Sequence, residues 1–214
     1  MRRRDFAVQG IDVSHYQKHI NWQEVATQNI SFAFVKATEG ATIKDTLFDI
    51  NWRDMGRVKL RRGAYHFFRP SIPTYKQVFN FIDAVKLNTG DLPPVLDVEV
   101  TDNVSPTALV NRVQSWLTIA ELHYGVKPII YTNASFYNRY LVGHFNDYPL
   151  WIARYGIYEP LQHDGRRWTF WQYGNQFRVG GIKNVVDLNA FYGTEADLYE
   201  LCIPTFTLSR GVKP

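Results

Sequence analysis

The sequence predicts an α/β fold, an irregular TIM-like barrel of about five β/α units followed by three strands that are joined by loops. A short stretch rich in aliphatic and aromatic residues recurs eight times and is followed each time by polar or turn residues. Helical patterns separate the first five stretches, whereas the segments after the sixth lack a helical period. The expected strands are Phe6–Val13, Phe32–Lys36, Gly63–Phe68, Val95–Val100, Pro128–Thr132, Leu150–Arg154, Thr169–Tyr173 and Val185–Ala190.

The expected helix with the strongest pattern is Ser105–Tyr124. Ser105 can cap its N-terminus, Pro106 suits its first turn, and apolar residues recur at helical spacing along it. The segments Tyr155–Arg167 and Gly174–Asn184 are predicted as loops. A doubly wound open sheet is the alternative architecture, but the glycine fingerprint of its nucleotide-binding members is absent from this sequence. The remaining expected helices are Asn21–Gln28, Thr46–Lys59, Thr74–Asn88, Ser135–Val142 and Thr194–Leu201.

Length and composition fit one globular domain that spans residues 1–214, with a core of about 9–201 and a tail at 203–214. The net charge of +4 comes partly from Arg2–Arg4, and without a dense basic stripe we expect no nucleic-acid partner. No apolar run approaches the roughly 20 residues that span a bilayer, and no signal peptide is visible. Cys202 is the one cysteine, so no internal disulfide can form. We expect a monomer.

Polar residues lie at the ends of most of the expected strands. In a β/α barrel the active site is built at the carboxyl ends of the strands, so these side chains should meet at one mouth. Carboxylates at several strand ends are the central observation. The strand-end residues that we select as a candidate site are Asp12, Tyr65, Asp97, Glu99, Tyr131, Trp151, Gln172 and Asp187.

The triplet Asp97-Val98-Glu99 stands in an otherwise apolar run. Residues two apart on a strand face the same side, with Cα atoms roughly 6.5 Å apart. Two acids on one buried face are costly unless they have partners or a function. Cleavage of a glycosidic bond needs one carboxylic acid to protonate the leaving oxygen and a second carboxylate near the sugar cation. An ion-paired strand end is the structural alternative, but the acids Asp12 and Asp187 favour a glycosidase site.

Other chemistries find less support in the sequence. The alternating Asp and Asn of a calcium loop is missing, and no two histidines have metal-ligand spacing on one helix, so we expect no metal and no cofactor. His66 is interpreted as a hydrogen-bonded residue of the barrel. No Gly-x-Ser-x-Gly motif occurs. Among the aromatic residues, we expect Tyr65 and Trp151 to face a sugar, since pyranose rings stack on aromatic side chains.

Several segments resemble, in order, the conserved blocks of glycoside hydrolase family 25, the fungal, phage and bacterial lysozymes. The resemblance covers about residues 9–201. The blocks that carry it are Asp12-Val13-Ser14 with Gln17, Lys36-Ala37-Thr38-Glu39-Gly40, Gly63-Ala64-Tyr65-His66-Phe67-Phe68, Leu96-Asp97-Val98-Glu99, Pro128-Ile129-Ile130-Tyr131-Thr132-Asn133, Leu150-Trp151-Ile152-Ala153, Trp171-Gln172-Tyr173 and Val186-Asp187-Leu188-Asn189.

This resemblance implies a lysozyme-type muramidase that hydrolyses the β-1,4 bond between N-acetylmuramic acid and N-acetylglucosamine in peptidoglycan. It implies Glu99 as the proton donor and Asp97 as its partner, acting either directly on the sugar or through the substrate's 2-acetamido group. Asp12 and Asp187 would shape the acidic pocket, and Tyr65, Tyr131, Trp151 and Gln172 would line it. It also implies peptidoglycan glycan strands as the partner and an extracellular, periplasmic or cell-wall location.

Two other functions stay open at this point. A glycosidase that acts on another N-acetylated glycan, such as chitin, would need the same pair of carboxyl groups. A non-catalytic barrel that binds cell wall would keep the groove, although loss of Asp97 or Glu99 would be its usual signature and both residues are present.

Overall fold

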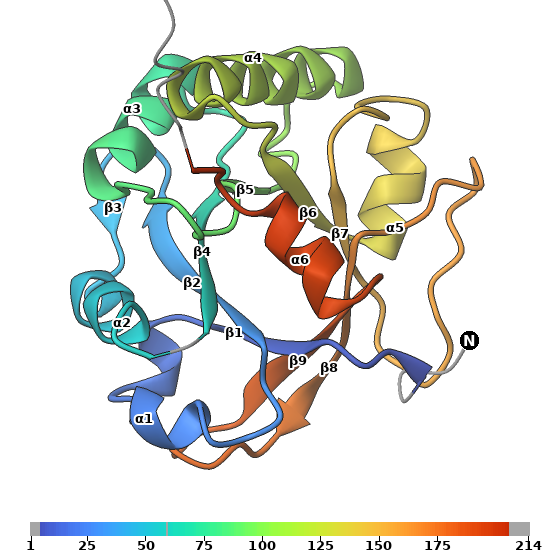
Figure 1. Cartoon of the computed structure of the whole chain (residues 1–214). Coiled ribbons are helices and arrows are strands. Elements are labelled where there is room, and N and C mark those ends of the chain that lie inside the picture. Colours follow the sequence, from blue (N-terminus) through green and yellow to red (C-terminus); the bar gives the residue numbers. More distant parts are fainter. Residues whose placement is uncertain (1–4, 59, 206–214) are drawn as a thin grey trace, which may run out of the picture.

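A computed structural model describes residues 5–58 and 60–205 of the chain. Within these residues the strands form one sheet in the order β1-β9-β8-β7-β6-β5-β4-β2-β3. A further pairing of β1 with β2 closes eight of the strands into a barrel and leaves β3 outside (Figure 1). The predicted irregular TIM-like barrel is therefore confirmed. The strands are β1 (Gln9–Val13), β2 (Phe32–Glu39), β3 (Ile43–Lys44), β4 (Arg61–Phe67), β5 (Val95–Asp97), β6 (Ile129–Asn133), β7 (Leu150–Ala153), β8 (Phe170–Phe177) and β9 (Val186–Phe191).

Helices from the first two thirds of the chain cover the outside of the barrel (Figure 1). The described residues between β7 and β8 and between β8 and β9 contain no helix, as predicted. The helical segments are the 3-10 turn η2 (His15–Gln17), α1 (Trp22–Val25), α2 (Phe48–Met55), α3 (Thr74–Ala84), α4 (Pro106–Tyr124), α5 (Ala134–Phe136), the π-helical turn η3 (Tyr137–Leu141) and α6 (Glu195–Leu201).

The structure corrects several predicted boundaries. Helix α2 is shorter than the predicted Thr46–Lys59, and position 59 lies outside the described residues. Strand β5 ends at Asp97 and not at Val100. Most of the predicted tail at 203–214 lies outside the described part of the chain, which ends at residue 205. The basic residues Arg2–Arg4 lie wholly outside it. The long helix α4 agrees with its prediction, because Ser105 accepts a hydrogen bond from the Ala108 amide and Gly125 ends the helix at a φ of 72°.

Strand direction decides where the last strand presents its residues. Neighbouring barrel strands from β1 to β8 are parallel along the pairs β1–β2, β2–β4 and onward to β7–β8. Strand β9 is antiparallel to both of its neighbours, β8 and β1. The segment between β8 and β9 is too short for the crossover that a parallel pair requires, so the chain returns as a hairpin. As a result, β9 begins at the barrel end where the other strands finish.

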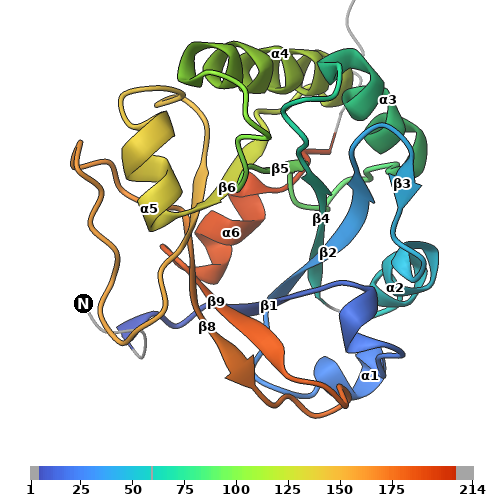
Figure 2. The ribbon, with the colours of Figure 1, turned by 180° about the vertical axis from the view of Figure 1, so that it is seen from behind.

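The interior of the barrel is filled by large aromatic side chains. Two inward-facing positions are glycines, and each leaves room for a phenylalanine. A Cβ atom on Gly10 would lie 2.3 Å from the ring of Phe32, and one on Gly63 would lie 2.4 Å from the ring of Phe34. Helix α6 packs Leu198 against the same interior cluster. Figure 1 shows α6 in front of the strands and Figure 2 shows it behind them, so this helix covers one end of the barrel.

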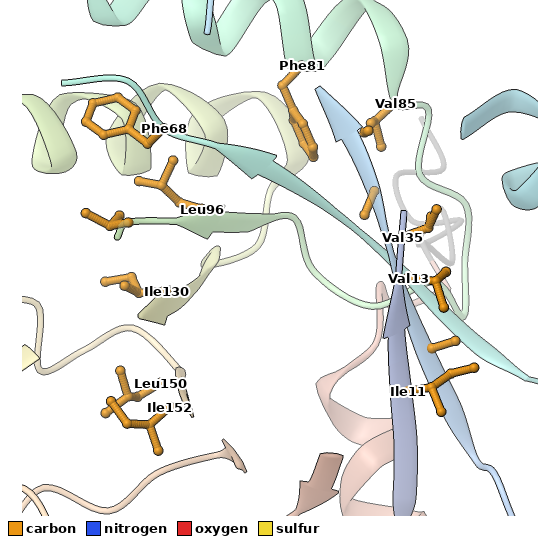
Figure 3. Close-up of a cluster of buried hydrophobic side chains, with 14 of the residues drawn as sticks. Ile11, Val13, Val35, Phe68, Phe81, Val85, Leu96, Ile130, Leu150 and Ile152 are labelled. Atoms are coloured by element: carbon orange, nitrogen blue, oxygen red, sulfur yellow. The ribbon is translucent and has the colours of Figure 1, made fainter. Parts of the chain in front are cut away.

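Outward-facing strand residues form a second apolar layer beneath the helices. Figure 3 shows Ile11 and Val13 of β1 beside Val35 of β2, and Phe81 of α3 above them. The outward-facing strand residues alternate along each strand with the inward-facing ones. This is the period-two pattern of a strand that is buried on both faces. Among the described residues no helix is long and apolar enough to cross a membrane.

Candidate active site

A pocket of about 430 Å³ opens at the carboxyl ends of the parallel strands. Each of the strands β1, β2, β4, β5, β6 and β7 contributes at least one side chain from its middle, its end or the positions just beyond it. Strand β8 contributes Gln172, its third residue. All the residues selected from the sequence line this one pocket: Asp12, Tyr65, Asp97, Glu99, Tyr131, Trp151, Gln172 and Asp187. The acids at distant positions in the sequence therefore do meet at one mouth.

Asp187 reaches the pocket because β9 is antiparallel. It stands near the start of its strand and is paired in register with Asp12 of β1. On a parallel strand the same position would lie toward the opposite end of the barrel.

The carboxyl groups of Asp12 and Asp187 are hydrogen-bonded to each other. Asp12 is buried, and its Oδ2 also accepts hydrogen bonds from Gln172 Nε2 at 2.9 Å and from Asn189 Nδ2 at 2.7 Å. Burial raises the pKa of Asp187 to about 8, and the charge of Asp12 adds to this rise. Two carboxyl groups in contact share a proton, because both cannot ionise cheaply.

Asp97 ends β5 and is 5% exposed. Burial raises its pKa well above the ordinary value, the charge of Glu99 raises it further, and the ammonium of Lys36 opposes the rise. Its Oδ1 has no hydrogen-bond partner among the described residues. Once Glu99 is protonated, the repulsion between these two acids disappears and Lys36 favours the carboxylate form of Asp97.

Glu99 lies two residues beyond the end of β5 and is half-buried. Burial raises the pKa of its carboxyl group, a hydrogen bond with Asn133 opposes the rise, and the charge of Asp12 adds to it. Asn133 ends β6, so two neighbouring strands hold this carboxyl group. A more open acid with a raised pKa beside other acids is the arrangement of a general acid.

Tyrosine hydroxyls complete the polar lining. Tyr131 donates a hydrogen bond to Gln172 Oε1 at 2.9 Å. Burial raises the pKa of Tyr65 and of Tyr131 well above that of an ordinary phenol, and the neighbouring acids raise both further. Both hydroxyls therefore remain protonated donors over the whole neutral range.

The expectation that Trp151 stacks on a sugar is wrong. The residue is 2% exposed, its ring stacks on Phe34 with centroids 4.5 Å apart, and its Nε1 donates to Asn189 Oδ1 at 2.8 Å. One face of the indole is therefore covered by Phe34, and its N–H is bound by Asn189. Tyr65, by contrast, is half-buried at the pocket, and its contact with a sugar remains a prediction.

Two exposed aromatic residues outside the predicted site also line the pocket. Tyr16 is 70% exposed and Tyr155 is 56% exposed, and both line the pocket. The signal for Tyr155 was available, because it continues the period-two series of Trp151 and Ala153 beyond the end of β7. Tyr16 lies in η2, directly after β1, where no strand periodicity marks it.

A charged cluster borders the acids on the β2 side. Lys36 Nζ lies 2.7 Å from Glu39 Oε2, and Arg69 Nη2 lies 2.6 Å from Glu39 Oε1. The two cations lower the pKa of Glu39 despite its partial burial, so Glu39 is ionised at neutral pH. Lys36 and Glu39 belong to the second block of the family resemblance, and both line the pocket.

Metal and thiol chemistry have no site in the part of the chain that the structure describes. No group of three or more His, Cys, Asp and Glu residues there could hold a metal ion. His66 is buried, with Nδ1 2.7 Å from Thr38 Oγ1 and Nε2 3.2 Å from Gln77 Oε1, as interpreted from the sequence. Burial raises the pKa of the Cys202 thiol to about 11, so it is not a thiolate nucleophile.

Comparison with known proteins agrees with this geometry. The family profile described as Glycosyl hydrolases family 25 matches residues 11–182. Uncharacterized protein YegX of Escherichia coli K12 is 43% identical over 198 residues, which cover 90% of this chain and 72% of that protein. Lysozyme M1 of Streptomyces globisporus is 36% identical over 209 residues, which cover 91% of this chain and 71% of the relative.

Solved structures show the same fold. A family 25 glycosyl hydrolase from Bacillus anthracis superposes with a TM-score of 0.86 at 35% identity, over 92% of this chain and 94% of that chain. A bacterial lysozyme from Streptomyces coelicolor gives the same TM-score and identity, over 92% and 97% of the two chains. The extent of these matches and the acidic pocket lead to one conclusion: the chain belongs to glycosyl hydrolases family 25 and is a glycoside hydrolase.

Proposed function

We propose that this protein is a lysozyme-type N-acetylmuramidase that hydrolyses the β-1,4 bond between N-acetylmuramic acid and N-acetylglucosamine in peptidoglycan. The observation that carries the proposal is the convergence of Asp12, Asp97, Glu99 and Asp187 on one pocket, in a chain whose relatives include lysozymes and N,O-diacetylmuramidases. Peptidoglycan glycan strands are the proposed partner.

Glu99 is the proposed general acid. Its carboxyl group is half-buried, has a raised pKa and is held by Asn133, so it keeps its proton to higher pH than an exposed glutamate does. It gives this proton to the glycosidic oxygen as the bond from that oxygen to C1 breaks. The leaving sugar departs with a free hydroxyl group, and Glu99 is left as the carboxylate that activates water in the second step.

Asp97 is the proposed partner of the substrate's 2-acetamido group. The acetamido oxygen forms a bond to C1 as the leaving group departs, and its N–H hydrogen-bonds to the Asp97 carboxylate. Water then adds to C1, gives a proton to Glu99 and restores the acetamido group, so the anomeric configuration is retained. Two features support this assignment over direct attack: Asp97 is only two residues from Glu99, and its buried Oδ1 has no protein partner in the described structure.

Tyr16 and Tyr155 are proposed as the sugar-stacking residues, in place of Trp151. Both rings are exposed at the pocket, as stacking requires. We further propose that residues 1–214 act as a single catalytic domain, that the protein is a monomer, and that it works on cell wall outside the cytoplasm.

The test is digestion of purified peptidoglycan with mass analysis of the products after borohydride reduction. A muramidase creates new reducing ends on muramic acid and no new free amines. Glu99→Gln serves as the matched inactive control. Reducing ends on glucosamine, or peptides released from intact glycan strands, would contradict the proposal.

A parallel digestion of chitin separates the rival functions. Chitin cleavage at a rate equal to that on peptidoglycan would favour a broader N-acetylglycan hydrolase. Pull-down with insoluble wall but no product from either polymer would favour a non-catalytic wall-binding barrel.

A further inference from the structure

Two hydrogen-bond chains end on the same oxygen of Asp12. In the first, Trp151 Nε1 donates to Asn189 Oδ1 at 2.8 Å and Asn189 Nδ2 donates to Asp12 Oδ2 at 2.7 Å. In the second, the Tyr131 hydroxyl donates to Gln172 Oε1 at 2.9 Å and Gln172 Nε2 donates to Asp12 Oδ2 at 2.9 Å. All five side chains are buried.

The indole determines the direction of the first chain. An indole N–H can only donate, so the atom of Asn189 that faces Trp151 must be the carbonyl oxygen. The amide nitrogen of Asn189 then faces Asp12 and can only donate to it. Asp12 Oδ2 thus accepts hydrogen bonds from two N–H groups. A proton on this oxygen would point at those N–H groups and would be repelled by them.

We propose that Trp151 and Asn189 are positioning residues that keep Asp12 ionised and thereby place the proton of the Asp12–Asp187 pair on Asp187. Asp12 is then a fixed negative charge at the floor of the pocket, while Asp187 is a neutral carboxylic acid that donates to Asp12. The catalytic consequence, but not the placement of the proton, depends on the proposed muramidase activity.

The charge on Asp12 acts on the proposed general acid, because a neighbouring anion disfavours ionisation of Glu99. Keeping Asp12 ionised therefore keeps Glu99 protonated to higher pH. Asp187, as a neutral acid, adds no competing charge. The titratable groups that line the pocket with Asp12 are Asp187 of β9, Asp97 and Glu99 at the end of β5, Tyr65 of β4, Tyr131 of β6, Tyr155 beyond β7, Tyr16 of η2, and Lys36 and Glu39 of β2.

The pKa directions agree with this placement. Burial raises the pKa of Asp12, but hydrogen bonds from Asn189, Gln172 and Asp187 all oppose the rise. For Asp187, burial, the charge of Asp12 and the hydrogen bond with Asp12 all act in the same upward direction. Asp187 is therefore the member of the pair that takes up the first proton as the pH falls.

The direct test needs no substrate. Carboxyl carbons of the wild-type protein are followed by ¹³C NMR between pH 3 and pH 9, with Asp187→Asn and Asp12→Asn used for assignment only. As the pH falls, the Asp187 carbon should report the first protonation and the Asp12 carbon should respond at lower pH. If Asp12 takes up the first proton, the proposal is overturned, whether or not the protein cleaves peptidoglycan.

A second test removes the indole donor. Trp151→Phe keeps an aromatic ring beside Phe34 but leaves Asn189 free to turn its amide. We expect the alkaline limb of the kcat/KM profile on peptidoglycan to move to lower pH by roughly half a unit to one unit, since Asp12 then holds less negative charge. The Asp12 carbon should also titrate at higher pH than in the wild type.

Trp22→Phe is the matched control. Trp22 is also 2% exposed, and its Nε1 donates to Asn51 Oδ1 at 3.1 Å, but this pair lies outside the pocket lining. It should lose a similar amount of stability and keep the wild-type pH profile. Equal profiles for the two variants would refute the positioning role. Should Trp151→Phe fail to fold, the wild-type titration still decides the placement of the proton.

Discussion

The substitution Glu99→Gln tests the proposed acid most directly. Glutamine has nearly the same shape and can still hydrogen-bond Asn133, but it has no proton to transfer. Glu99 is half-buried with a raised pKa, so its carboxyl group keeps its proton to higher pH than an exposed glutamate does. Where the wild-type side chain is protonated, the variant replaces one neutral group by another, and we expect the free energy of unfolding to change by less than about 1 kcal/mol.

The expected loss of activity is far larger than the change in stability. General acid catalysis typically contributes about 10² to 10⁴ in rate. A sugar hydroxyl is a poor leaving group without protonation, so we expect kcat to fall by about 10³-fold or more, while KM changes little. The wild-type enzyme should lose activity as the pH rises through the raised pKa of Glu99. Any residual activity of the variant should lack that alkaline limb.

The assay is release of reducing ends from purified peptidoglycan between pH 4 and pH 9, with thermal unfolding and oligosaccharide binding measured on the same samples. Glu200→Gln is the matched control, since Glu200 is exposed on α6 and does not line the pocket. A Glu99→Gln protein that turns over within tenfold of the wild-type rate would refute the assignment. So would a control variant that is equally inactive.

Three further predictions follow from the same pocket. Asp97→Asn should fold normally and lower kcat by about 10²-fold or more, because the charge beside the reacting centre is lost; steady-state kinetics and circular dichroism check both parts. Tyr155→Ala should raise KM for glycan about fivefold to tenfold if the ring stacks on sugar. Tyr199→Ala is the control: this tyrosine on α6 is comparably exposed, and its loss should leave KM unchanged. An unchanged KM in Tyr155→Ala would assign the ring another role. The pKa of Asp187 is raised from 3.8 to about 8, so its folded form binds the proton more tightly and the melting temperature should decline as the pH rises across that window; Asp187→Asn should flatten the decline, and an equally steep dependence in that variant would disprove the linkage.

The sequence by itself determined the class of fold and the acids of the pocket that lie at the ends of parallel strands. Strand stretches that recur between helical patterns predict a β/α barrel, and the carboxyl ends of its strands are where functional side chains gather. Asp12, Asp97 and Glu99 could be selected because each lies at or just after such an end. This reasoning needs only local periodicity and the direction of parallel strands, both of which a sequence expresses directly.

Tertiary structure alone decided three other features. Asp187 enters the pocket because β9 runs antiparallel to both β8 and β1. Trp151 is buried because Phe34 of a distant strand covers its face and Asn189 takes its N–H. The exposure of Tyr16 depends likewise on which neighbours leave it uncovered. The physical reason is common to all three: strand direction, burial and hydrogen-bond partners are set by contacts between segments far apart in the sequence, and local patterns carry no record of those contacts.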